Sequence, residues 1–226
     1  MLEPDKRPQE PFLASLSTEE LAALRSRAVP RRFARGATIV HQGELPARVL
    51  AIERGRAKVS AITEDGKEIV LAFRGPGDLI GEVSALGGEP RSATVRALEP
   101  LEALAVSTRD FETFLEQHPR VALVILKVVI ARLREADRQQ IEFAAYHTLG
   151  RIARRLVELA ERFGEPCEDG IQISLRISQE ELAGWAGASR EASSKALRDL
   201  REMGLIDTKR RLLTVRKLDE LRRLAV

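Results

Sequence analysis

The amino-acid sequence predicts an α+β protein with three successive parts: a β-roll of the jelly-roll type, a long helix, and a winged helix-turn-helix. Three observations carry this prediction. Short β-rich runs alternate with glycine-containing turns over residues 31–107, and a heptad pattern follows over residues 118–147. Two short helical patterns around a glycine and a final hairpin pattern then close the chain. We place the domains at 1–117, 118–146 and 147–226.

The first predicted element is a helix over residues 12–28, where apolar residues recur at near-helical spacing. Ser17-Thr18-Glu19-Glu20 has the polar pattern of a helix start, and Pro30 is expected to end the helix. In the β-rich part, Asp65-Gly66 between two alternating runs is a strong hairpin signal. The expected strands are 38–40, 49–52, 57–62, 69–73, 93–97 and 101–106.

The long helix is predicted over residues 118–147, with apolar residues at alternating spacings of four and three. A helix of ~30 residues spans ~45 Å, which is more than one small domain covers. We therefore expect the seam to pair with a second copy of the chain, and packing on its own β-roll is the alternative. The seam comprises Ala122, Leu126, Val129, Leu133, Ala136, Gln140 and Phe143, in which Gln140 is polar.

After residue 147 the sequence predicts a helix over 149–163, a loop, a strand over 171–175, and then two short helices around Gly187. Ser178 and Glu181 form a capping-box pattern at the first short helix, and Gly204 is placed to end the second. Trp185 is expected to pack inside the domain. A hairpin over 205–215 carries cations at its tip, as a wing that touches phosphates would.

The second short helix is expected to read DNA, because the N-terminal residues of that helix in a helix-turn-helix face the major groove. Arginine and lysine can bind guanine there, and glutamate can accept from cytosine. Solvated charges on an exposed face are the alternative interpretation. The candidate DNA-contacting residues are Ser178, Gln179, Ser189, Arg190, Glu191, Ser194, Lys195, Lys209 and Arg210.

The distribution of charge agrees with a polyanion partner at the C-terminal end. The formal net charge is +3. Residues 148–226 hold 16 Lys and Arg against 13 Asp and Glu, whereas the remainder of the chain holds 21 of each. The whole excess therefore lies in the predicted helix-turn-helix part.

Residues 77–95 form the most specific stretch of the front half. Arg91 can offer a charge-assisted fork to an anion, and Ser92 can donate its hydroxyl and its backbone N–H. Gly81 lets the backbone come close, and backbone N–H groups near Glu82–Ser84 can line the same concavity. Glu82 can accept from a ribose hydroxyl. A chance pair of surface charges is the alternative.

Other classes of protein find little support. A single cysteine, Cys167, closes no internal disulfide and holds no iron–sulfur cluster, and the three histidines lack metal-ligand spacing. The sequence contains no nucleophile elbow and no Walker motif, so we expect no metal, no catalytic residue and no enzyme activity. Without a signal peptide or an apolar run of ~20 residues, we expect a cytoplasmic protein that does not enter a membrane.

These stretches resemble the cyclic-AMP receptor protein / FNR family. Residues 178–191 are similar to its reading head, residues 148–153 to the start of its DNA-binding domain, and Gly81-Glu82 with Arg91-Ser92-Ala93 to its phosphate-binding cassette. The resemblance implies a cyclic-nucleotide-binding β-roll, a homodimer, and double-stranded DNA and RNA polymerase as partners. It also implies that Arg190, Glu191 and Lys195 contact a TGTGA-type half-site. The implied ligand contacts are Gly81, Glu82, Val83, Ser84, Arg91, Ser92, Ala93, Leu71, Ala136 and Asp137.

The chain departs from the family pattern in both parts. Lys195 stands where the cyclic-AMP receptor has arginine, and Ala192 replaces a common threonine, so one G·C pair is expected to be read less strictly. Ala136 and Asp137 stand where that receptor has a Thr-Ser pair on adenine. Asp137 can accept from the amino group of adenine, or from N1–H and N2–H of guanine.

Cyclic AMP is therefore the expected ligand, and cyclic GMP is the alternative. A family member with another effector or no ligand, a nucleotide-sensing scaffold that acts on a protein partner, and a haem or redox sensor remain open.

Overall fold

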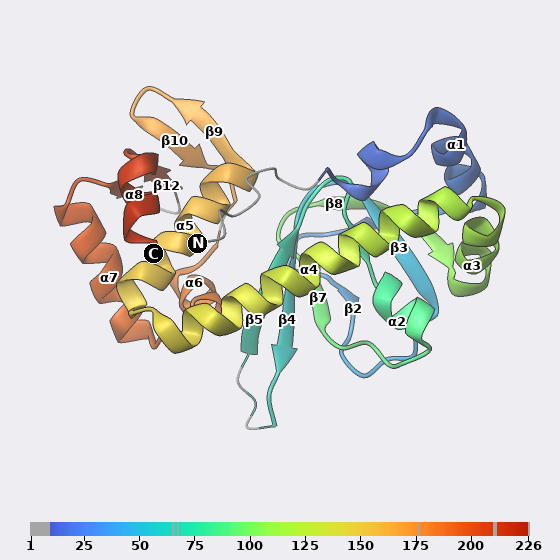
Figure 1. The fold of residues 1–226 in the computed structure, drawn as a ribbon, viewed down its shortest axis with the longest axis horizontal. Helices are drawn as coiled ribbons and strands as arrows, with labels where there is room; N and C mark the ends of the chain where they lie inside the picture. The colour runs from blue at the N-terminus through green and yellow to red at the C-terminus, as the bar shows by residue number, and fades with distance from the viewer. Residues whose placement is uncertain (1–9, 65, 67, 176, 210–211, 226) are drawn as a thin grey trace. The chain divides into compact units, whose positions relative to one another are not determined.

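A computed structural model describes residues 10–225, except residues 65, 67, 176, 210 and 211 (Figure 1). The chain divides into two compact units, and the division falls between Glu135 and Ala136. Glu68–Val70 belong with the second unit. Within the described part of the chain, each helix is too short or too polar to cross a lipid bilayer.

The first unit contains a β-roll and several helices, and the long helix follows the β-roll as predicted. Its elements are η1 (Phe12–Ser15), α1 (Thr18–Arg27), β1 (Val29–Phe33), β2 (Thr38–Val40), β3 (Arg48–Arg54), β4 (Ala57–Ile62), the last part of β5 (Glu68–Arg74), β6 (Leu79–Ile80), α2 (Glu82–Gly87), β7 (Thr94–Ala97), β8 (Leu101–Ser107), α3 (Thr108–Gln117) and the first part of α4 (Pro119–Ala145).

Two four-stranded sheets enclose the central core of this unit, in the orders β1-β8-β3-β6 and β2-β7-β4-β5. Leu50 and Ile52 of β3 pack into the space between the sheets with Val95 of β7, and Val49 and Ala51 point the other way. Because both faces of β3 are covered, four consecutive residues are buried instead of every second one. The two antiparallel sheets confirm the predicted β-roll.

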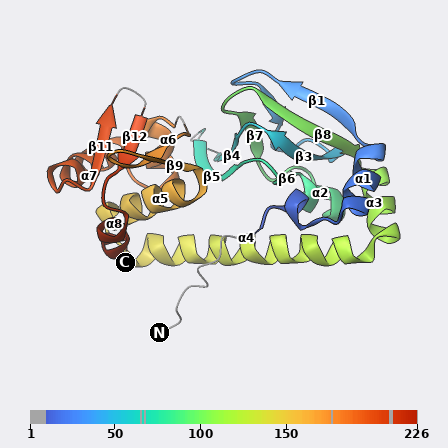
Figure 2. The same cartoon turned by 90° about the horizontal axis from the view of Figure 1, so that it is seen from above.

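Helices cover the outer face of the β1-β8-β3-β6 sheet. Leu24 of α1, Phe111 and Phe114 of α3, and Val121 and Ile125 of α4 are all buried there. Helices α1 and α3 lie side by side at this place (Figure 2). This second apolar layer fixes the first part of α4 on the β-roll.

The N-terminal helix differs from the prediction of one helix over 12–28. It is broken into η1 and α1, because Leu16 and Ser17 adopt extended backbone with ψ of 144° and 163°. Ser17 needs that conformation to cap α1: its hydroxyl accepts from the Glu20 N–H at 3.2 Å, and its own N–H donates to the Glu20 carboxylate at 2.8 Å.

Strand β1 was not predicted. It pairs with β8 at the edge of its sheet, where Pro30, opposite Leu104, is tolerated because an edge strand has one unpaired side.

Helix α4 has two faces with opposite environments in the first unit. Val121, Val124 and Ile125 are buried against the β-roll. On the other side, Leu126 and Leu133 of the predicted seam are 52% and 60% exposed, and they are joined by exposed Leu123 and Ile130. The helix thus packs on its own β-roll and still leaves Leu126 and Leu133 of the seam exposed. Of the seam residues, Ala122, Leu126, Leu133, Ala136, Gln140 and Phe143 are exposed and Val129 is half-buried.

The second unit is built around α5 (Thr148–Phe163), whose apolar face is buried by the elements that follow (Figure 2). Residues 164–170, expected to be a loop, instead form β9 (Gly164–Cys167) and the turn to β10 (Gly170–Ile173), because Cys167 pairs with Gly170. The remaining elements are α6 (Gln179–Trp185), α7 (Arg190–Glu202), β11 (Ile206–Lys209), β12 (Leu212–Val215) and α8 (Leu218–Leu224); α8 was not predicted. The sheet order is β11-β12-β10-β9.

One ion pair fastens α1 to α4 in the first unit and makes its stability depend on pH. Arg120 donates to both oxygens of the nearly buried Glu20, with Nε to Oε1 at 2.8 Å. These hydrogen bonds, helped by the Ser17 N–H, lower the pKa of Glu20 to about 2 from its ordinary 4.5. Because the folded pKa lies below the unfolded one, this stabilisation is present above about pH 4.5 and is lost as the pH falls toward 2.

We predict that Glu20→Gln lowers the melting temperature at pH 7 and flattens its decline between about pH 4.5 and 2. The neighbouring exposed Glu19→Gln is the control and should keep the wild-type acid decline. Thermal melts followed by circular dichroism across this pH range measure both. An unchanged acid decline in Glu20→Gln would show that this pair does not control acid unfolding.

Candidate functional site

The predicted anion site forms where β6 ends and α2 begins. Gly81 joins the two elements with a φ of +84°, in the left-handed region that favours glycine. A Cβ atom at this position would lie 2.8 Å from Cζ of Arg91. Glycine is therefore required twice, by the backbone conformation and by the close approach of the guanidinium.

Arg91 is a buried cation, only 5% exposed, that is held against backbone carbonyls. Its Nη1 donates to the Gly81 carbonyl at 2.7 Å, and its Nη2 donates to the Arg48 carbonyl. Burial lowers the pKa of Arg91, and the charges of Glu82 and Glu44 act in the opposite direction. The result is a positively charged fork, fixed in position in a poorly solvated place.

Glu82 is 1% exposed and forms an ion pair with Arg132 of α4 through Oε1. Arg132 also donates from Nη2 to the Leu79 carbonyl at 3.0 Å. The second carboxylate oxygen of Glu82, Oε2, has no hydrogen-bond partner among the described residues. A buried acceptor without a donor is costly, so this oxygen is suited to a hydroxyl donor from a ligand.

Sequence reasoning missed Arg132. The available signal was its position four residues before Ala136, which places both on one face of the helix. No motif marks it, because its partner Glu82 is distant in the sequence.

The predicted ligand residues differ in how deeply they are buried and in which element carries them. The structure brings Gly81, Glu82, Ser84 and Arg91 together, with Ser84 Oγ 3.4 Å from the Pro90 carbonyl. Those that follow Arg91 differ, since Ser92 is exposed and Ala93 is buried. Val83 on α2 and Leu71 on β5 are 54% and 40% exposed. Ala136 and Asp137 are exposed on α4 at the start of the second unit. The ligand roles of all these residues stay predictions.

The helix-turn-helix of the second unit is built by two caps and a glycine turn. Ser178 accepts from the Glu181 N–H at 3.1 Å and donates its own N–H back to that side chain at 2.8 Å. Gly187, with φ of +58°, turns the chain, and Ser189 caps α7 by accepting from the Ala192 N–H at 3.2 Å. This confirms the two predicted helices and their starts.

The outward face of α7 carries the predicted base-reading side chains. Arg190, Glu191 and Lys195 are exposed, and Ser194 is half-buried with its Oγ 3.5 Å from Oε1 of Gln179. The Glu191 backbone N–H and the Ser189 hydroxyl lower the pKa of Glu191, so it is a carboxylate acceptor at neutral pH. The opposite face is buried through Ala196, Leu197 and Leu200, which fixes the orientation of the helix.

The remaining predicted DNA contacts lie at the helix starts and in the wing. Ser178, Gln179 and Ser189 are exposed. Strands β11 and β12 pair antiparallel, with Thr208 opposite Leu213. The side chain of Lys209 and the whole of Arg210 lie outside the described residues, so their roles stay predictions. Trp185 is 2% exposed, which confirms its predicted packing role.

Two family models match the two halves of the chain. The cyclic nucleotide-binding domain matches residues 30–118, and the Crp-like helix-turn-helix domain matches residues 150–224. The class is thus a DNA-binding regulator that carries a cyclic-nucleotide-binding domain.

Curated relatives agree with this class. The CRP-like cAMP-activated global transcriptional regulator of Mycobacterium tuberculosis is 31% identical over 186 residues, which are 82% of this chain and 83% of the relative. The global nitrogen regulator of Nostoc sp. is 30% identical over 192 residues, which are 84% and 86% of the two chains.

A solved CRP-family transcriptional regulator from Thermus thermophilus has a TM-score of 0.73 at 28% identity and covers 86% of this chain and 96% of its own. The chain belongs to the Crp/Fnr family of transcription regulators, and its relatives are regulators and not enzymes.

We predict that Arg190→Ala weakens binding to specific DNA by ~1–3 kcal/mol and relaxes base preference at one position of each half-site. Arg198→Ala, which removes an exposed arginine from later in the same helix, should change affinity much less. Fluorescence anisotropy on a selected site and on its single-base variants measures both effects. Equal losses for the two variants would remove Arg190 from the reading surface.

Proposed function

We propose that this protein is a homodimeric transcription regulator that binds a cyclic nucleotide in its first unit and a two-fold symmetric, TGTGA-like operator with its second. Cyclic AMP is the leading ligand. The protein acts on double-stranded DNA in the cytoplasm together with RNA polymerase. The observation that carries the proposal is the buried cradle of Gly81, Glu82 and Arg91, which combines a cationic fork with an unsatisfied acceptor.

The chemistry of the cradle suits a ribose cyclic phosphate better than a simple anion. A phosphate needs donors, and it can compete with the Arg48 and Gly81 carbonyls for the Arg91 guanidinium. The adjacent Oε2 of Glu82 repels a bare anion but accepts from a hydroxyl. A ligand that carries both groups a few atoms apart satisfies both residues.

The identity of the base depends on the α4 residues. Ala136 offers no side-chain hydrogen bond, and the exposed Asp137 offers only acceptors. One acceptor pair suits the amino group of adenine, and it suits the N1–H and N2–H donors of guanine as well. The relative in M. tuberculosis is named as cAMP-activated, which favours cyclic AMP. Asp137 is the specific reason to keep cyclic GMP as the second candidate.

The homodimer is supported by the exposed apolar face of α4. Leu123, Leu126 and Leu133 are each more than half exposed while the other side of the same helix is buried. A row of large apolar side chains on a soluble regulator marks a protein interface. A second copy supplies the same row, as a two-fold axis along the seam requires.

A dimer also explains how ligand binding would act on DNA. Two recognition helices must lie about one DNA turn, ~34 Å, apart to enter successive major grooves. The ligand shifts the population toward the arrangement that meets this spacing, provided that it binds this arrangement better than the other.

We predict that Arg91→Gln weakens binding of the cyclic nucleotide by about 1.5–3 kcal/mol, or about 10- to 150-fold in Kd, through loss of charge-assisted hydrogen bonds. Arg96→Gln, an exposed arginine on β7, is the matched control and should bind as wild type does. Isothermal titration calorimetry with cyclic AMP and with cyclic GMP measures the affinities and identifies the base. Nucleotide affinity that survives Arg91→Gln unchanged would refute the cradle.

A further inference from the structure

The short connector between α4 and α5 looks like the joint at which the DNA-reading unit could turn. Only Tyr146 and His147 separate the two helices. The compact units, however, divide ten residues earlier, between Glu135 and Ala136, within one continuous helix. The last part of α4, Ala136–Ala145, therefore belongs with the helix-turn-helix, and we call this segment the arm.

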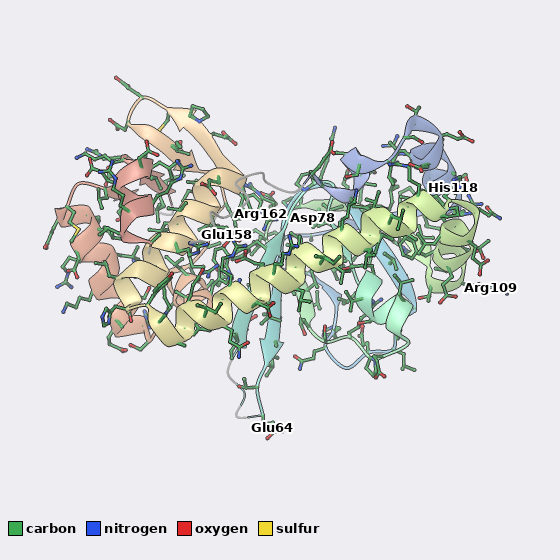
Figure 3. The ribbon with its side chains drawn as sticks, viewed as in Figure 1. Glu64, Asp78, Arg109, His118, Glu158 and Arg162 are labelled. Carbon is green, nitrogen blue, oxygen red and sulfur yellow. The ribbon has the colours of Figure 1, made fainter. Side chains whose placement is uncertain are left out.

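Glu142 attaches the arm to the unit through a buried charge cluster. It is 1% exposed, and its carboxylate forms ion pairs with Arg154 and Arg155 of α5, on the other side of the connector. Arg155, which is also 1% exposed, donates from Nη1 to Glu158 at 2.8 Å. Figure 3 labels Glu158 on α5 close to Arg162, with which it makes a longer ion pair of 3.8 Å.

The cluster continues to the helix-turn-helix itself. Cζ of Arg155 lies 5.1 Å from the ring centroid of Trp185, in the last turn of α6, and Trp185 is 2% exposed. A row of buried contacts thus connects α4, α5 and α6 through Glu142, Arg155 and Trp185.

A second set of contacts spans the same connector. Arg151 donates to three backbone carbonyls: Tyr146 in the connector at 2.6 Å, Ala186 at 2.8 Å and Gly187 at 3.1 Å, the last two in the turn before α7. Its guanidinium lies 5.9 Å from the ring centroid of Phe143 in the arm. That ring also packs on Gly187, where an added Cβ would lie 2.7 Å from Cε1.

These contacts prevent the connector from acting as a free joint. Bending there would separate the buried Glu142 carboxylate from Arg154 and Arg155 and would leave it without these partners, which is strongly unfavourable. The same bend would remove the Arg151 hydrogen bonds from the turn that leads into α7.

We propose that Glu142 is a positioning residue for DNA binding: it fastens the arm to the helix-turn-helix, so that the arm and the recognition helix α7 move as one body. Ala136 and Asp137 are the first residues of this body. One consequence rests on the proposed function. If a nucleotide contacts these two residues, it acts directly on the body that reads DNA, with no flexible joint in between.

The test compares Glu142→Gln with Glu161→Gln in the full-length protein. Glu161 makes an ion pair with Arg222 at 2.8 Å on the surface of the same unit, so its loss is a matched control for removing a paired carboxylate. Arg154→Gln is the milder variant if Glu142→Gln fails to fold, because the buried Glu142–Arg155 pair then remains.

Two readouts do not depend on any ligand. Amide hydrogen exchange over residues 139–147 should become at least about 10-fold faster in Glu142→Gln and stay unchanged in Glu161→Gln. The emission of Trp185, the single tryptophan of the sequence, should change in Glu142→Gln alone. Exchange that is already fast in the wild type, or equal in the two variants, would overturn the proposal.

A third readout separates positioning from a merely structural role. Operator affinity is measured without nucleotide and with saturating cyclic AMP or cyclic GMP, whichever binds. Glu142→Gln should keep its nucleotide Kd but lose at least about 5-fold of the nucleotide-induced gain in operator affinity. Equal weakening with and without nucleotide would contradict positioning. If the wild type responds to neither nucleotide, the proposed function fails, and the exchange and emission results still decide whether Glu142 fastens the arm.

Discussion

The buried guanidinium of Arg91 is the group on which the proposed nucleotide binding depends. Arg91 lies against Gly81 with its donors on two backbone carbonyls, and the second oxygen of Glu82, which is also buried, finds no donor among the residues that the structure describes. Such an arrangement is costly in the absence of a ligand, since the charge and the acceptor are both removed from water. A molecule with an anionic phosphate and a hydroxyl would satisfy both groups, and this is the physical basis of the nucleotide binding that we propose for the first unit.

In the mechanism that we propose, helix α4 is the element that carries the effect of nucleotide binding to DNA. Arg132 brings it to Glu82 in the first unit, its exposed apolar face offers a seam to a second copy, and Glu142 fixes its last part to the helix-turn-helix. Each interaction lies on a different part of the same helix. The Glu142 ion pairs join the last part of α4 to the unit that carries α7, so we propose that a change in this part of the helix acts directly on α7.

The sequence was sufficient wherever the signal is local. The capping pattern at Ser178, the turn at Gly187, the heptad spacing of α4 and the Gly81-Glu82 motif all depend on near neighbours in the chain, and the structure has each in place. Elements that depend on tertiary partners could not be predicted from the sequence. Strand β1 is an example: Pro30 argues against a strand at this place, and β1 forms because it pairs with β8 at the edge of the sheet.

Two side chains of the proposed sites, Arg132 and Glu142, also could not be predicted, because their role depends on tertiary contacts. In the sequence, Arg132 and Glu142 have the pattern of ordinary solvent-facing charges of a helix, and only the ion pairs that each makes in the structure distinguish them. The most direct test of the central claim is operator affinity, measured by fluorescence anisotropy with and without saturating cyclic AMP or cyclic GMP. We expect at least about 10-fold tighter operator binding with one of the two nucleotides, within the usual range of coupling between sites. Equal affinity in all three conditions would contradict it.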